Sequence, residues 1–136
     1  PAMGKTSFAT SVMLNLLQNK KKCLLFSLEM SQEMVVKRLI VQDSEIDSLL
    51  IRRPELLHPE HWEKVAMSLN SISEYDLTID DTCSITIEEI REKIEAEKPE
   101  YVFIDYLQLI YTTDEKSRAD GIAEIMTKLK RILLVN

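Results

Sequence analysis

Glycine, cysteine and aromatic residues are all scarce in this chain, and each scarcity narrows the kind of protein it is. Only 2 of its 136 residues are glycine and 2 are cysteine. Cys23 and Cys83 form neither a CxxC pair nor a metal-ligand spacing, which disfavours a disulfide scaffold and favours a reducing, cytoplasmic setting. Aromatic residues make up 6%, so leucine, isoleucine, valine and methionine must fill the core.

Long apolar runs and an excess of basic residues are also missing. No run approaches the roughly 18 residues that a membrane-spanning helix needs, and no targeting signal is visible, so we expect no membrane partner. The net charge of -6 argues against a protein that coats nucleic acid by charge alone, but not against a motor that grips one strand through a few loops. Because the chain begins at Pro1 and stops at Asn136 after an apolar stretch, we expect it to belong to a longer protein.

The apolar pattern alternates between helix and strand spacing, which predicts an α/β fold with a parallel sheet flanked by helices, forming one partial domain over residues 1–136. The strands are expected at 23–28, 77–79 and 101–105. The helices are expected at 6–19, 32–42, 60–72, 86–97 and 119–134, while the segment 46–57 is ambiguous. The first helix is expected to face inward through Phe8, Val12, Leu16 and Leu17. Methionines at apolar helix positions are expected in the core: Met13, Met34, Met67 and Met126.

The start of the chain has the form of the end of a phosphate-binding loop. Such a loop reads GxxxxGK[ST], and Gly4, Lys5 and Thr6 match its last three positions. Gly4 lets backbone N–H groups close around phosphate oxygens, Lys5 supplies a cation, and Thr6 offers a hydroxyl to Mg²⁺. The alternative is a chance match before a helix, but an amphipathic helix and then a buried strand follow, as the motif requires.

Two acidic residues follow apolar runs where strands are expected to end: Glu29 after CLLFSL and Asp105 after YVFI. Ligands of open α/β sheets lie at the carboxyl ends of strands, and an ATPase needs one carboxylate near Mg²⁺ and one that activates water. Asp105 is therefore a candidate Mg²⁺ residue and Glu29 a candidate general base. The alternative is that both are solvated residues where strands emerge. Asp80 and Asp81 are interpreted as capping or solvent-facing residues, with an acidic rim of the same site as the alternative.

Four segments together resemble the motor domain of DnaB-family replicative helicases. They read PAMGKT at 1–6, FSLEMS at 26–31, LTIDD at 77–81 and YVFIDYLQL at 101–109. They stand in the family's order, and the resemblance extends to about Lys130. SLEM and DYLQ are far more specific than GKT alone. The fold that the resemblance implies is a RecA-like P-loop NTPase, incomplete at both ends.

The resemblance also implies two cofactors, ATP and Mg²⁺, and a role for each matching residue. The nucleotide-binding residues would be Met3, Gly4, Lys5, Thr6, Ser7 and Gln108. Lys5 and Glu29 would be catalytic, with Glu29 activating water. Thr6 and Asp105 would serve Mg²⁺, the latter through water.

The family that the chain resembles works as a ring of six, hydrolyses ATP and moves on single-stranded DNA at replication forks. The resemblance therefore implies a homo-hexamer, with primase and a helicase loader as further partners. The arginine finger and the DNA-holding loops are expected outside this chain, so we expect negligible ATPase activity from these 136 residues alone.

Two other functions share the core motifs: a RecA-type recombination or repair ATPase, and a nucleotide-binding regulator that no longer hydrolyses. SLEM and DYLQ favour the helicase over the first, and Glu29 argues against the second. His58 and His61 lack a third ligand for zinc, and Trp62 lacks basic neighbours for base stacking, so we expect packing roles for Trp62 and no metal site at the histidines.

Overall fold

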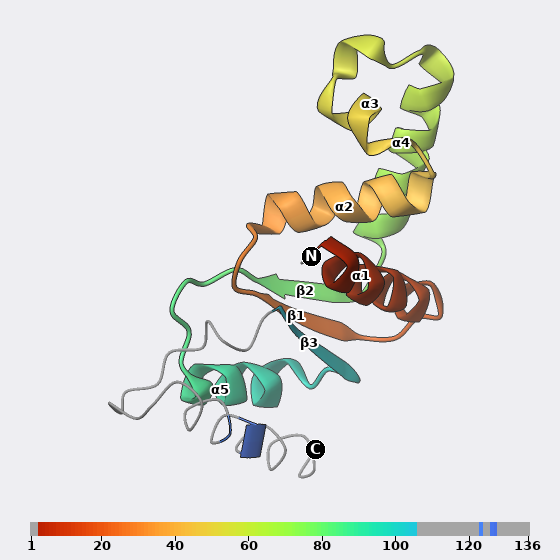
Figure 1. Cartoon of the computed structure of the whole chain (residues 1–136). Helices are drawn as coiled ribbons and strands as arrows, with labels where there is room; N and C mark the ends of the chain where they lie inside the picture. The colour runs from red at the N-terminus through yellow and green to blue at the C-terminus, as the bar shows by residue number, and fades with distance from the viewer. Residues whose placement is uncertain (1–2, 106–122, 124–125, 128–136) are drawn as a thin grey trace. The chain divides into compact units, whose positions relative to one another are not determined.

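The chain folds into two compact units, each built from segments that are distant in sequence. The computed structural model describes residues 3–105, 123, 126 and 127, with side chains from Ser7 onward. One unit combines Pro1–Lys22 with Gln32–Leu77, and the other combines Cys23–Ser31 with Thr78–Asn136. Figure 1 labels the helices and strands of both units.

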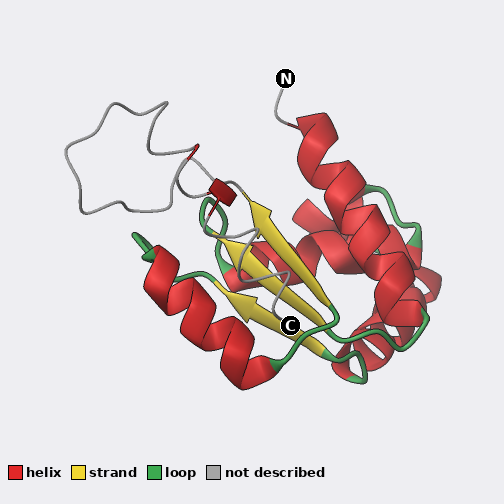
Figure 2. Ribbon diagram, turned by 90° about the horizontal axis from the view of Figure 1, so that it is seen from below, coloured by secondary structure: helices red, strands yellow, loops and turns green. Residues whose placement is uncertain are grey.

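The second unit is organised around a three-stranded sheet in the order β2-β1-β3 (Figure 2). Its strands are β1 (Cys23–Ser27), β2 (Leu77–Asp80) and β3 (Tyr101–Asp105). β1 and β3 are parallel, with register pairs running from Cys23 and Tyr101 to Ser27 and Asp105. Every residue of β1 is buried, as the continuous apolar run predicted for a strand covered on both faces.

Helix α5 (Ile87–Glu97) covers this sheet with a stripe of isoleucines. Ile87, Ile90 and Ile94 are buried at helical spacing, as predicted. They form one core cluster with Leu24, Phe26 and Ile85, against which Leu28, Val102 and Ile104 also pack. The helix begins with a capping box, in which Thr86 Oγ1 accepts from Glu89 N–H at 3.2 Å and Thr86 N–H donates to Glu89 Oε2 at 2.7 Å.

The first unit is helical, and its middle helix contacts the other two long ones. Its elements are α1 (Met3–Gln18), α2 (Gln32–Ser44), α3 (Ser48–Arg52), the 3₁₀ turn η1 (Pro54–Leu56) and α4 (Pro59–Ser73). Helix α2 contacts both α1 and α4. The segment that the sequence left ambiguous begins where Asp47 Oδ1 accepts from Leu49 N–H at 2.8 Å, which caps α3.

The buried face of α1 differs from the predicted one. Its buried side chains are Thr10, Met13, Leu14 and Leu17. Phe8 is 72% exposed and Val12 38%, so the prediction that they face inward is wrong. Apolar residues surround this helix, so their spacing does not single out one side.

The methionine prediction is correct only for Met13, which is 2% exposed. Met34, Met67 and Met126 are each at least half-exposed.

The predicted helix at 119–134 lies outside the described residues, apart from 123, 126 and 127, which are helical. Among the described residues no helix has the length and apolar character needed to cross a bilayer.

Candidate nucleotide site

The turn after β1 carries Glu29 and is fixed by a buried hydrogen bond. Ser27 Oγ donates to the carbonyl oxygen of Met30 at 2.7 Å, and both residues are buried. Glu29 lies between them in sequence and is exposed. The bond from the Ser27 side chain to the Met30 backbone thus anchors the turn, while Glu29 itself is exposed to solvent.

Asp105 is the last residue of β3 and lies at the same edge of the sheet. It is the register partner of Ser27, and its carbonyl oxygen accepts a hydrogen bond from Leu28 N–H at 2.8 Å. Its side chain is half-buried. The prediction that both acidic residues lie at strand ends is therefore confirmed: Glu29 comes shortly after β1, and Asp105 is the last residue of β3. The parallel pairing puts both at the carboxyl edge, where α/β sheets bind ligands.

Asp80, at the end of β2, has a structural role instead. Its side chain is only 4% exposed, and Oδ2 forms an ion pair with Lys93 Nζ of α5 at 2.5 Å. Its Oδ1 accepts from Thr82 N–H at 2.9 Å. Burial raises the pKa of Asp80, but the hydrogen bonds from Lys93 and Thr82 and the lysine charge together hold it below its usual value. The solvent-facing interpretation of Asp80 is therefore wrong, whereas Asp81 is exposed.

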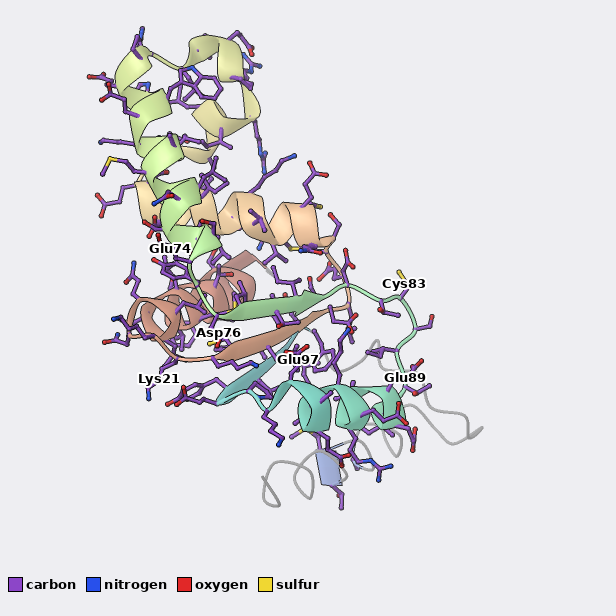
Figure 3. The ribbon with its side chains drawn as sticks, turned by 180° about the vertical axis from the view of Figure 1, so that it is seen from behind. Lys21, Glu74, Asp76, Cys83, Glu89 and Glu97 are labelled. Carbon is purple, nitrogen blue, oxygen red and sulfur yellow. The ribbon has the colours of Figure 1, made fainter. Side chains whose placement is uncertain are left out.

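A second side-chain contact ties β2 to α5. Thr78 Oγ1 donates to Glu97 Oε2 at 3.5 Å, one turn of helix beyond Lys93. Figure 3 shows Glu89 and Glu97 at opposite ends of α5, and Cys83 in the loop that joins β2 to this helix. Alternate residues of the strand, Thr78 and Asp80, thus contact residues four apart on the helix, Glu97 and Lys93, which joins β2 to α5 through two side-chain contacts.

The phosphate-binding motif lies at the start of α1. The helix begins at Met3, so Gly4, Lys5 and Thr6 all fall within its first turn. This turn holds no acidic residue, and the free N–H groups and positive end of a helix favour an anion. The side chains of Met3 to Thr6 lie outside the described set. Ser7 is exposed.

The candidate residues are distributed over both units. Lys5 and Thr6 belong to the helical unit, whereas Glu29 and Asp105 belong to the sheet unit. Gln108 lies outside the described residues. Within the part of the chain that is described, no three His, Cys, Asp or Glu residues form a metal-binding group. The carboxylate of Asp105 at the edge of the sheet fits Mg²⁺, which usually binds one or two protein carboxylates together with phosphate oxygens and water.

Sequence reasoning missed the contacts of Gln42, a residue of α2. Its Nε2 donates to the carbonyl oxygen of Ser7 at 3.2 Å and to Ser11 Oγ at 3.1 Å. No motif marks Gln42, because the contact joins residues 35 apart in the chain.

The histidines have a local role: His58 N–H donates to His61 Nδ1 at 3.1 Å, which satisfies a backbone donor at the start of α4. Trp62 is 50% exposed.

Solved structures of related proteins have the same fold. One solved ATPase domain superposes with a TM-score of 0.90 at 33% identity, covering 97% of this chain and 49% of that one. A DnaB-like replicative helicase, whose structure was described with its interactions with primase, gives a TM-score of 0.89 at 33% identity over 97% of this chain and 33% of that one. The chain therefore has the RecA-like ATPase fold.

The sequence comparisons give the family. The model of the DnaB-like helicase C terminal domain matches residues 1–133, and the chain belongs to this family. The replicative DNA helicase DnaB of Geobacillus stearothermophilus is 34% identical over 139 residues, and that of Rickettsia typhi is 36% identical over 148. Both alignments cover 97% of this chain, which spans 30% of the length of each relative.

Proposed function

We propose that this chain is part of the motor of a replicative DNA helicase, which couples ATP hydrolysis to movement on single-stranded DNA and to duplex unwinding. The observation that carries the proposal is the register pair of Ser27 and Asp105, which sets Glu29 and Asp105 at one carboxyl edge of the sheet. Membership of the DnaB-like family supports it. The recombination ATPase and the inactive regulator are not favoured, because the relatives are replicative helicases.

The proposed cofactors are ATP and Mg²⁺, and the proposed chemistry follows from the residue types. Lys5 neutralises charge on the β- and γ-phosphates, and Thr6 binds Mg²⁺. Asp105 supports the metal through water. Glu29 accepts the proton of the attacking water, for which an exposed carboxylate on an anchored turn is suited. Met3, Gly4, Ser7 and Gln108 are proposed as further nucleotide contacts.

The proposed partners follow from the same family. A neighbouring subunit of a homo-hexamer would supply the arginine that completes each ATP site, and single-stranded DNA would be held by residues outside this chain. Primase is a proposed partner because one related structure was described with its primase interactions. We further propose a helicase loader as a partner and a cytoplasmic location.

The test uses the full-length protein and measures phosphate release with and without single-stranded DNA, together with unwinding of a forked duplex. We expect Mg²⁺-dependent hydrolysis that the single strand stimulates, and unwinding that needs both ATP and a fork. Hydrolysis without unwinding, with extended filaments in place of closed rings in electron micrographs, would favour a recombination ATPase. Nucleotide binding without turnover would favour the regulator.

A further inference from the structure

The side-chain amide of Gln42 in α2 is hydrogen-bonded to the second and third turns of α1. Its Nε2 lies 3.2 Å from the carbonyl oxygen of Ser7 and 3.1 Å from Ser11 Oγ. Ser11 Oγ in turn donates to the same carbonyl oxygen at 2.9 Å. One backbone carbonyl near the start of α1 therefore receives two side-chain donors, one of them from another helix.

The orientation of this amide is set by chemistry. If the amide were reversed, Gln42 Oε1 would face the carbonyl oxygen of Ser7, and two acceptors would repel each other. In the orientation present, Oε1 is buried and has no hydrogen-bond partner among the described residues. A buried acceptor without a partner is unfavourable. The two hydrogen bonds that the amide nitrogen donates to α1 offset this cost.

The location of the contact connects it to the phosphate-binding motif. Ser7 directly follows Lys5 and Thr6, and all three belong to the beginning of α1. The first turn of a helix lacks half of its backbone hydrogen bonds and frays easily. A cross-link from α2 at Ser7, the residue that follows this turn, restrains the helix directly after Lys5 and Thr6.

We propose that Gln42 is a positioning residue for nucleotide binding, which holds the first turn of α1 in the geometry that Lys5 and Thr6 need to bind phosphate and Mg²⁺. This inference rests on the proposed function. It assigns a role to a residue that lies outside every motif segment of the sequence. Gln42 itself does not touch the nucleotide and acts only through α1.

A second polar contact between the same helices provides a matched control. Gln18 Nε2 donates to Asp43 Oδ1 at 3.3 Å, and Gln18 is the last residue of α1. Removing this contact also weakens the packing of α1 on α2, but at the end of α1 that is remote from Lys5 and Thr6. A purely structural effect would therefore appear in both variants, whereas a positioning effect would appear only at Gln42.

The experiment compares Gln42→Leu and Gln18→Leu in the full-length protein, using a fluorescent ATP analogue with Mg²⁺ to measure Kd, together with KM and kcat for ATP. For Gln42→Leu we expect Kd and KM to rise about fivefold to tenfold, with a smaller change in kcat, because displaced binding groups weaken the ground-state complex. For Gln18→Leu we expect Kd and KM as in the wild type. Thermal unfolding of both variants measures the structural effect separately.

Equal Kd values for Gln42→Leu and the wild type would overturn the inference, and so would an equal rise in both variants. If Gln42→Leu does not fold, the variant Ser11→Ala tests the inference instead. It removes one of the two acceptors of the Gln42 amide, and alanine is a good helix former. Ser11→Ala should raise Kd in the same direction, and an unchanged Kd would overturn the inference. A wild-type protein that binds no nucleotide would instead refute the proposed function.

Discussion

Ser27 and Asp105 are register partners at the carboxyl ends of β1 and β3, and the next backbone N–H, that of Leu28, donates to the carbonyl oxygen of Asp105 at 2.8 Å. The backbone positions of Glu29, the proposed general base, and Asp105, the proposed Mg²⁺ residue, therefore depend on one parallel strand pair. Neither residue relies on a long loop for its placement. Displacing the end of β1 should accordingly affect the chemistry as well as the stability.

The first prediction concerns Ser27→Ala, which removes the hydrogen bond from Ser27 Oγ to Met30. We expect a loss of about 1 kcal/mol in the free energy of unfolding, because the Met30 carbonyl loses its partner in a buried site. We also expect a lower kcat for ATP, because the turn that carries Glu29 is released. Urea unfolding and steady-state kinetics measure the two effects.

Ser73→Ala is the matched control for Ser27→Ala. Ser73 Oγ donates to the carbonyl oxygen of Asn70 at the same distance, 2.7 Å, but at the exposed end of α4. Water can replace that bond, so this variant should differ little from the wild type in either measurement. An equal loss of stability in both variants would contradict the role given to the buried turn.

The second prediction concerns the ion pair between Asp80 and Lys93. Lys93→Met should lower the stability at pH 7 by about 2 kcal/mol, because a buried carboxylate loses a charged hydrogen-bond donor. The folded-state pKa of Asp80 lies below its ordinary value, so the stabilisation is fully present above the unfolded-state pKa and is lost as the pH falls through the folded-state pKa. The difference between wild type and variant should therefore shrink in the acid range, below the ordinary aspartate pKa.

Chemical denaturation of both proteins across the acid range tests this prediction. Lys37→Met is the control, since it breaks the Lys37–Glu33 pair, whose side chains are 59% and 76% exposed. Solvent screens such a pair, so its loss should leave the stability nearly unchanged at every pH. A difference between wild type and Lys93→Met that persists unchanged through the acid range would rule out Asp80 as the titrating partner.

The third prediction concerns Lys98, which ends α5 in the left-handed conformation with φ 49° and ψ 55°. A side chain with Cβ is disfavoured there and glycine is not, so Lys98→Gly should raise the free energy of unfolding by about 1 kcal/mol. Lys98→Ala removes the same charge but keeps Cβ, and should give no gain. If alanine stabilises as much as glycine, the effect comes from the charge and not from the backbone.

Elements with strong local signals were predictable from the sequence. α5 has the capping pair Thr86 and Glu89 followed by isoleucines at helical spacing, and β1 is a short apolar run. Each signal lies within a few residues, so it needs no knowledge of the rest of the fold. The placement of Glu29 and Asp105 followed because parallel strands share a carboxyl edge.

Features that depend on contacts between distant segments were not predictable. The predicted inward face of α1 was wrong because its apolar residues lie all around the helix. Only the segments that pack against α1 determine which side is buried. The Asp80–Lys93 pair depends on how β2 and α5 cross, and the Gln42–Ser7 contact on how α1 and α2 pack. The roles of Lys5 and Gln108 stay predictions.

The central proposal is that Glu29 activates the water that hydrolyses ATP. The most direct test measures single-turnover hydrolysis of ATP by the full-length Glu29→Gln variant, next to Glu33→Gln, which changes an exposed glutamate four residues further on. We predict that Glu29→Gln binds ATP with the wild-type Kd but hydrolyses it about 10²- to 10⁴-fold more slowly, as loss of a general base would cause, while Glu33→Gln behaves as the wild type. Hydrolysis by Glu29→Gln at the wild-type rate would contradict the account.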